Sequence, residues 1–195
     1  MPTEQHPFPP FLPEGARILF LGSFPPPPAR WSIPFFYPNW INDFWRILGL
    51  IHFGDKDHFC LPAEKRFNEP AIRDFCTRRG LAFYDTATEV RRLRDNASDA
   101  FLEVVTPTDI RALLRHIPTC RTLVTTGEKA SALAAACFAC AVPPVGGKIE
   151  LPDGLTLWRM PSTSRAYPLP LTQKAEAYRR LFAAQQAPAS SSQAL

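Results

Sequence analysis

The stretch that decides the fold is RILFLGSFP, residues Arg17 to Pro25. Its first part, Arg17 to Gly22, is a short apolar run that ends in glycine, as expected of a strand buried on both faces of a parallel sheet. Ser-Phe-Pro follows at once, and proline stops both strands and helices. The stretch therefore predicts a buried strand that runs into a stiff loop at the edge of a sheet.

Strands and helices are expected to alternate along the rest of the chain. Three more apolar runs predict strands at Leu81–Thr86, Arg121–Thr126 and Leu155–Met160. Helical spacing and capping residues predict helices at 42–50, 64–79, 106–116, 127–139 and 171–185. This alternation predicts an α/β fold, a three-layer α/β/α sandwich with a short, mainly four-stranded parallel sheet.

Several helix ends are predicted from individual residues. Asn42 or Asp43 is expected to cap the first helix and Thr106 the third, with Pro107 in the first turn of the third. Gly80 is expected to end the second helix. The charged segment from Arg91 to Ser98 is expected to be a loop.

Length and hydropathy predict one domain, residues 1–186, in a chain of 195 residues. The small, polar end, residues 187–195, is expected to be disordered. No apolar run approaches the roughly 20 residues that span a bilayer, and the segment from Met1 to Pro13 lacks the features of a signal peptide. We therefore expect a cytoplasmic protein with no membrane partner.

The net charge of +4 permits a polyanionic partner without requiring one, and a solvated basic surface explains it equally well. The five cysteines are an odd number and are expected to be reduced thiols. Cys137 and Cys140 form a C-x-x-C pair whose role stays open, because no further ligands follow at metal-site spacing. No metal and no redox cofactor are expected.

Three motifs carry the candidate chemistry. They are Gly22-Ser23-Phe24-Pro25 after the first strand, the aromatic segment Phe35 to Trp45, and Met160-Pro161-Ser162-Thr163-Ser164-Arg165-Ala166-Tyr167 after the last strand. The carboxyl ends of parallel strands meet at one edge of a sheet, where open α/β sheets bind ligands. The motifs are therefore expected to gather at that edge.

In this order the motifs resemble the uracil-DNA glycosylase superfamily, and most of all its hypoxanthine (deoxyinosine) DNA glycosylase branch. The resemblance extends from about Arg17 to Phe182. It implies a monofunctional glycosylase of base-excision repair, which flips a deaminated base, hypoxanthine or uracil, into a pocket. It also implies a partner that is double-stranded or single-stranded DNA with a damaged base. A monomer is expected.

Base-binding roles are expected for Phe24, Phe36, Tyr37 and Asn39. Phe36 and Tyr37 would stack on the base through their aromatic faces, and the resemblance places Tyr37 at the family's stacking position. Phe24 would contact the base through its backbone amide. Phe36 fits a core position equally well. Asn39 is the main catalytic candidate, because an amide both donates and accepts hydrogen bonds. A turn residue that caps the following helix is the alternative for Asn39.

The first motif departs from the superfamily, which usually places Asp or Asn directly after the strand to activate water. This chain has Ser23-Phe24-Pro25 there, so Ser23 is the second catalytic candidate. Asp43 is the nearest carboxylate in sequence, although charge stabilisation of a helix start explains it better. Residues expected to contact DNA are Ser162, Thr163, Ser164, Arg165, Tyr167 and Lys129.

Two rival interpretations stay open. A superfamily member without the usual carboxylate could bind DNA or flipped bases without cleaving them. An unrelated α/β hydrolase or nucleotide-binding enzyme has less support, because the sequence contains no Walker A, G-x-S-x-G or helix-opening G-x-G-x-x-G motif.

Overall fold

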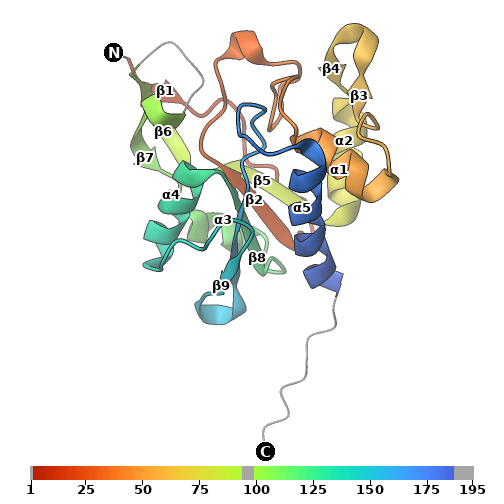
Figure 1. Cartoon of the computed structure of the whole chain (residues 1–195). Coiled ribbons are helices and arrows are strands. Elements are labelled where there is room, and N and C mark those ends of the chain that lie inside the picture. Colours follow the sequence, from red (N-terminus) through yellow and green to blue (C-terminus); the bar gives the residue numbers. More distant parts are fainter. Residues whose placement is uncertain (1, 94–98, 187–195) are drawn as a thin grey trace, which may run out of the picture.

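The structure is a computed structural model that describes residues 2–93 and 99–186 (Figure 1). The tail expected at 187–195 lies outside the described residues, as do residues 94–98 of the expected loop.

A five-stranded sheet forms the centre of the molecule. Its strands are β5 (Leu81–Asp85), β2 (Ile18–Gly22), β8 (Thr122–Thr126), β10 (Thr156–Met160) and β9 (Lys148–Glu150), in that order across the sheet. The first four are parallel, and β9 pairs antiparallel with β10 at one edge. The four strands predicted from the sequence are therefore confirmed, and β9 is an addition to them.

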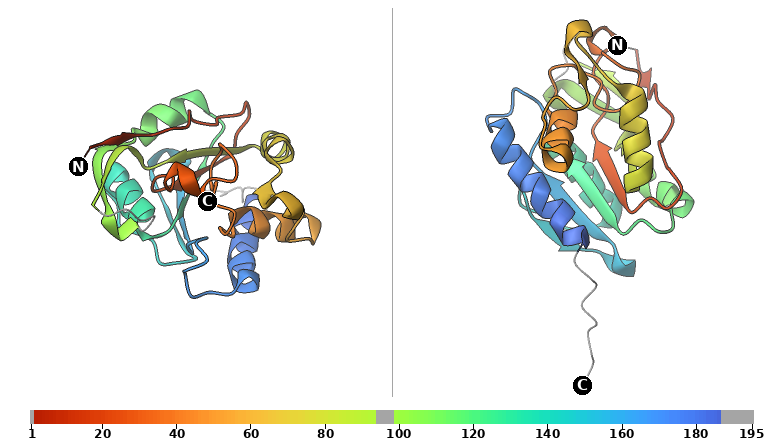
Figure 2. Two further views of the ribbon diagram at one scale, coloured as in Figure 1. Left: turned by 90° about the horizontal axis from the view of Figure 1, so that it is seen from above. Right: turned by 90° about the vertical axis from the view of Figure 1, so that its right-hand side faces the viewer.

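Helices cover both faces of this sheet. They are α1 (Phe44–Phe53), α2 (Glu69–Arg79), α3 (Ile110–His116), α4 (Glu128–Phe138) and α5 (Leu171–Gln186). In Figures 1 and 2, α1, α2 and α5 lie on one side of the sheet and α3 and α4 on the other. The α/β sandwich expected from the sequence is confirmed. Within the described residues, no helix is both long and apolar enough to cross a membrane.

The strands are buried because both faces of the sheet are covered. All five residues of β2 and all five of β5 are buried. Phe20 of β2 stacks on Phe83 of β5 at 5.4 Å between ring centroids, and Phe44 of α1 meets Phe20 edge-on at 5.3 Å. Aromatic side chains thus join the helix layer to the sheet and fix where the loops at the strand ends begin.

A second, antiparallel sheet was not expected. It joins β1 (Glu4–Gln5), β6 (Ala87–Arg92) and β7 (Leu102–Pro107) in the order β1-β6-β7. The predicted helix start at Thr106 is wrong, because 102–107 is an edge strand, where proline is tolerated. The N-cap of α3 is Asp109, whose carboxylate accepts from the amide of Ala112 at 2.9 Å. The loop expected from Arg91 is also wrong for its first two residues, which belong to β6.

The predicted helix at 64–79 begins later than expected. Its expected first residues include the end of a 3-10 turn at Glu64 and strand β4 (Arg66–Phe67), which pairs with β3 (Cys60–Leu61) in a short hairpin. Asn68 then caps α2 by accepting from the amide of Ala71 at 3.3 Å, and Gly80 ends the helix as predicted. Single turns of 3-10 helix complete the described elements, at Pro28–Arg30, Pro62–Glu64, Asp99–Phe101 and Pro152–Gly154.

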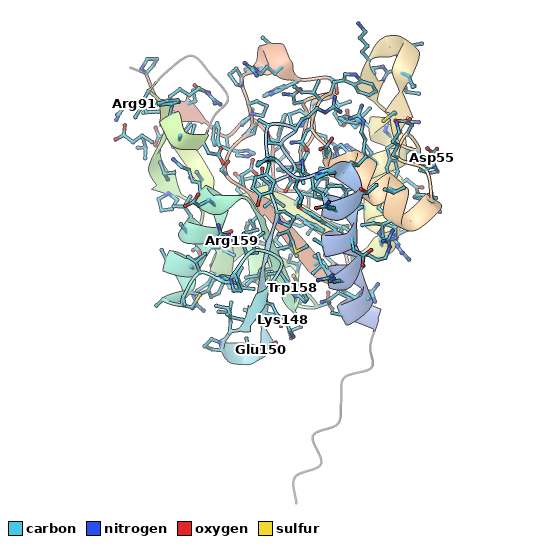
Figure 3. The ribbon with its side chains drawn as sticks, viewed as in Figure 1. Asp55, Arg91, Lys148, Glu150, Trp158 and Arg159 are labelled. Carbon is cyan, nitrogen blue, oxygen red and sulfur yellow. The ribbon has the colours of Figure 1, made fainter. Side chains whose placement is uncertain are left out.

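The two ends of the central sheet differ in character. Lys148 and Glu150 of β9 form an exposed ion pair at 2.8 Å, and Figure 3 shows them with Trp158 towards the lower end of the sheet. The loops that follow Gly22 and Met160 leave the opposite end. That opposite end, where the parallel strands terminate, carries the candidate site.

Candidate functional site

A cavity of about 760 Å³ opens at the carboxyl ends of the parallel strands. We call it the edge cavity. Parts of all three sequence motifs line it, together with the ends of β5 and β8 and the turn that precedes β7. Its walls include Gly22, Ser23, Phe24, Tyr37, Asn39, Asp85, Asp99, Thr126, Ser162, Thr163, Ser164, Arg165 and Tyr167. The expected gathering of the motifs at one sheet edge is therefore what the fold produces.

The turn after β2 forms one wall of the cavity. Ser23 is 8% exposed, and its hydroxyl donates to Oδ1 of Asp99 at 2.7 Å. Phe24 is half-buried and meets the ring of His6 edge-on, with centroids 5.3 Å apart. The loop is thus held by contacts to distant parts of the chain and not by proline alone.

Two carboxylates that the sequence reasoning missed lie in this cavity. Asp85 ends β5 beside Gly22, its partner in the register of the sheet. Asp99 begins the turn that leads into β7, and burial raises the pKa of its carboxyl group, while the hydroxyl of Ser23 partly offsets the rise. The first motif itself has no acid, but the fold supplies two beside it. The acid at the end of the predicted strand LAFYDT was the available signal for Asp85.

Tyr37 lies against the floor of the cavity. Its ring stacks on Phe44 with centroids 3.8 Å apart and planes 6° from parallel, and its hydroxyl lies 2.9 Å from Oγ1 of Thr126. Burial raises the pKa of this phenol well above its usual range, so the hydroxyl stays neutral. The residue has a φ of 50°, an uncommon conformation for a bulky side chain. Because the ring stacks on Phe44, one of its two faces is already covered by protein.

Phe36 also lines the cavity but belongs mainly to the core. It is 3% exposed and stacks on Phe83 with centroids 5.9 Å apart. The core position expected as one alternative for Phe36 is confirmed, and its base-binding role stays a prediction.

Asn39 combines a turn contact with a place on the cavity wall. Its Oδ1 accepts from the amide of Ile41 at 3.1 Å, as in the turn interpretation. Among the described residues, its Nδ2 makes no hydrogen bond. The cap at the start of α1 is instead shared: Asp43 is the N-cap residue, and Oδ1 of Asn42 accepts from the amide of Phe44 at 2.9 Å. The amide group of Asn39 is left available to a ligand.

The loop after β10 is built from small hydrogen-bonded turns. Oγ of Ser162 accepts from the amide of Ser164 at 3.2 Å, and Oγ of Ser164 accepts from the amide of Ala166 at 3.3 Å. Helix α5 begins at Leu171, so these hydroxyls lie in the loop that precedes the helix. They line the cavity through the loop itself.

A buried ion pair ties this loop to α1. Nζ of Lys174 donates to Oδ2 of Asp43 at 2.9 Å and to the carbonyl of Ser164 at 2.8 Å, and Lys174 is fully buried. The guanidinium of Arg165 lies 3.6 Å from Oδ1 of Asp43. Asp43 therefore has a structural role at the helix start and does not line the cavity.

Lys129 is the one candidate DNA contact that the fold keeps apart from the others. Its ammonium donates to the carbonyl of Leu102 in β7, and it is not among the residues that line the cavity. Residues 2–93 and 99–186 contain no group of three His, Cys, Asp or Glu side chains placed to hold a metal ion.

The fold is similar to that of solved structures. No protein-family model and no curated protein matches the sequence. A solution NMR structure of a "putative uracil DNA glycosylase" from Methanosarcina acetivorans is similar at a TM-score of 0.60. The two chains share a fold. Their sequences are 21% identical, and the match covers 90% of this chain and 96% of the other. At that identity the likeness extends to the fold alone.

Proposed function

We propose that this protein is a DNA glycosylase that hydrolyses the N-glycosidic bond of a deaminated base, hypoxanthine or uracil, in DNA. The observation that carries the proposal is the edge cavity, which joins the turn after β2, the Tyr37–Asn39 segment and the loop after β10. A flipped base needs such a recess, with polar groups for its edge and a loop at the mouth for the DNA strand. The fold shared with the archaeal protein supports the same class of activity.

The base would lie between the aromatic and amide groups of the wall. Phe24 is half-buried and offers ring surface, and stacking is worth about 1–3 kcal/mol for each base. Phe36 is 3% exposed and would support the base only through the small part of its ring that faces the cavity. Tyr37 stacks on Phe44 and presents a neutral hydroxyl, so it would contact the base by its edge or its remaining face. The amide of Asn39 would bind the base as negative charge develops on it in the transition state.

Acid groups would complete the chemistry. Cleavage of an N-glycosidic bond passes through an oxocarbenium-like state, which nearby carboxylates stabilise. Asp99 has a raised pKa and is held by Ser23, so it is a candidate to accept a proton from the attacking water. In this assignment Ser23 orients Asp99, and the acid comes from outside the first motif.

The DNA strand would lie across the mouth of the cavity. The loop of Ser162, Thr163, Ser164, Arg165 and Tyr167 offers hydroxyls, backbone amides and one guanidinium to phosphate oxygens. Arg165 is 55% exposed despite its approach to Asp43, which leaves it free to reach a phosphate. Lys129, by contrast, would need to leave the carbonyl of Leu102.

The test is cleavage of labelled duplexes and single strands that contain one deoxyinosine or one deoxyuridine, followed by alkali to reveal abasic sites. We expect cleavage of at least one, and a loss of about 100-fold or more in kcat for Asn39→Ala. Asn68→Ala is the matched control, because Asn68 caps α2 and does not line the cavity. Full activity in Asn39→Ala would overturn the central residue assignment.

The rival function is a protein that binds flipped bases without cleaving them. Mobility shift with an abasic-site duplex, run beside the cleavage assay, separates the two. Binding without product from any deaminated base would favour the rival.

A further inference from the structure

The N-terminal segment, residues 2–13, lies along the sheet that carries the edge cavity. We call it the N-terminal arm. Its β1 pairs with β6, and the amide of His6 donates to the carbonyl of Thr88 at 2.8 Å. Farther along, Phe11 and Phe83 exchange backbone hydrogen bonds at 2.8 and 3.0 Å. The arm is therefore anchored on both sides of His6.

His6 points inward from this arm and is held on all sides. Its side chain is only 2% exposed, and the ring of Tyr84 lies 4.6 Å from it between centroids. Nδ1 faces the backbone of Phe8, 2.8 Å from the carbonyl oxygen and 3.2 Å from the amide nitrogen. These contacts fix the ring so that Nε2 points at one group, the carboxylate of Asp85.

The contact with His6 gives the two oxygens of the Asp85 carboxylate different surroundings. Oδ2 lies 2.8 Å from Nε2 of His6 and accepts a hydrogen bond from it. Oδ1 takes no hydrogen bond from any described residue and lies over Gly22 at the floor of the edge cavity. In the described part of the chain, no lysine or arginine forms an ion pair with Asp85. Since a buried carboxylate without partners is costly, His6 is the group that makes this position tenable.

We propose that His6 is a positioning residue, which holds the Asp85 carboxylate so that Oδ1 accepts a hydrogen bond from an N–H group of the bound base. The identity of the ligand rests on the proposed function. The sugar of a flipped nucleotide stays at the mouth, so the floor of the cavity meets the far edge of the base. Hypoxanthine and uracil both carry a ring N–H beside a carbonyl on that edge. A fixed acceptor reads this group, whereas a freely rotating carboxylate reads it poorly.

Four variants test the proposal through cleavage of deoxyinosine and deoxyuridine substrates. His6→Phe keeps a buried ring without a donor, and His6→Gln keeps an N–H donor. We expect His6→Phe to lower kcat/KM by about 10- to 100-fold, by analogy with the loss seen when the hydrogen-bond partner of a metal-ligating side chain is removed. His6→Gln should recover most of that loss. Asp85→Asn should be at least as damaging as His6→Phe, and the double variant His6→Phe/Asp85→Asn no worse than Asp85→Asn.

Two outcomes would overturn the proposal. One is wild-type kcat/KM in His6→Phe while Asp85→Asn is defective. The other is losses that multiply in the double variant, since residues that act through one another do not contribute independently. Thermal unfolding of each variant identifies a loss of fold, and rescue by His6→Gln separates positioning from packing.

A second measurement tests the positioning role of His6 even if the protein cleaves none of the DNA substrates. Protein labelled with ¹⁵N-histidine is titrated with free hypoxanthine and free uracil. We expect the His6 ring signals to shift with at least one base in the wild type and not in Asp85→Asn. Shifts without cleavage would refute the proposed activity and support this inference. The absence of any shift with both bases, in a protein that does cleave DNA, would overturn the inference alone.

Discussion

Gly22 leaves open the space that the carboxylate of Asp85 fills. The two residues are paired across the parallel strands β2 and β5. A Cβ atom at residue 22 would lie 2.4 Å from Oδ1 of Asp85, closer than any real Cβ contact. Residue 22 must therefore be glycine for Asp85 to keep this position. The placement of Oδ1 at the floor of the cavity depends on the missing side chain.

Gly22→Ala should accordingly displace Asp85. Because backbone and a held carboxylate must both give way, we expect a loss of about 1–3 kcal/mol in the free energy of unfolding. Cleavage should fall more than tenfold, since Oδ1 moves. Gly154→Ala is the control: it has open space around it and lies far from the cavity, so it should cost only backbone strain and leave cleavage unchanged. Urea unfolding and the cleavage assay measure the two effects, and a normal Gly22→Ala would contradict the geometry.

The buried pair of Lys174 and Asp43 gives a prediction on stability. Lys174→Met removes the buried counter-charge of Asp43 and leaves only the exposed guanidinium of Arg165, 3.6 Å away. Breaking a buried pair typically costs about 3–5 kcal/mol. The double variant Asp43→Leu/Lys174→Met removes both charges and should recover much of that loss. Urea unfolding of the two single variants and the double variant forms a thermodynamic cycle. Additive losses would show that the 2.9 Å contact contributes little.

The parts of this protein that sequence reasoning predicted are those encoded locally. The apolar run Arg17–Gly22 by itself predicts a buried strand, and Gly80 by itself predicts the end of a helix. The groups at the floor of the cavity are paired across long stretches of chain: His6 meets Asp85 across 79 positions, and Ser23 meets Asp99 across 76. No periodicity or spacing carries such a pairing. The same holds for β7, where Pro107 suggested the start of a helix and cross-strand pairing decided otherwise.

Two buried tyrosines predict that the free energy of unfolding decreases at alkaline pH. Burial raises the pKa of Tyr37 and of Tyr178 above the usual value of 10. Above pH 10 the unfolded chain releases these protons while the folded chain keeps them, so stability falls as pH rises. Each phenol contributes a slope of up to about 1.4 kcal/mol per pH unit. Tyr37→Phe should reduce the slope measured by urea unfolding between pH 9.5 and 11. An unchanged slope would mean that Tyr37 ionises normally.

His52 predicts the opposite dependence on the acid side. Burial, and then the charge of Arg79, lower the pKa of its imidazole from 6.5 to about 4. The unfolded chain therefore takes up a proton first, and stability is lost as pH falls from 6.5 towards 4. The ring is partly exposed, so solvent limits the effect to about 1 kcal/mol. His52→Phe keeps the ring contacts with Phe75 and Phe182 and should flatten this part of the wild-type profile.

A variant of Arg165 should affect DNA binding without affecting the chemistry at the base. Its guanidinium lies at the mouth of the cavity, exposed and 3.6 Å from Asp43, whose charge Lys174 already balances. Arg165→Ala should therefore weaken binding to an abasic-site duplex and lower the dependence of log K on log salt by about one phosphate contact. It should raise KM and leave kcat close to wild type, because uniform binding is lost while the cavity is intact. Lys129→Ala is the matched control, and since its ammonium is engaged by Leu102, little change in the salt slope is expected. A larger change in Lys129→Ala than in Arg165→Ala would move the DNA path from the loop after β10 towards the second sheet.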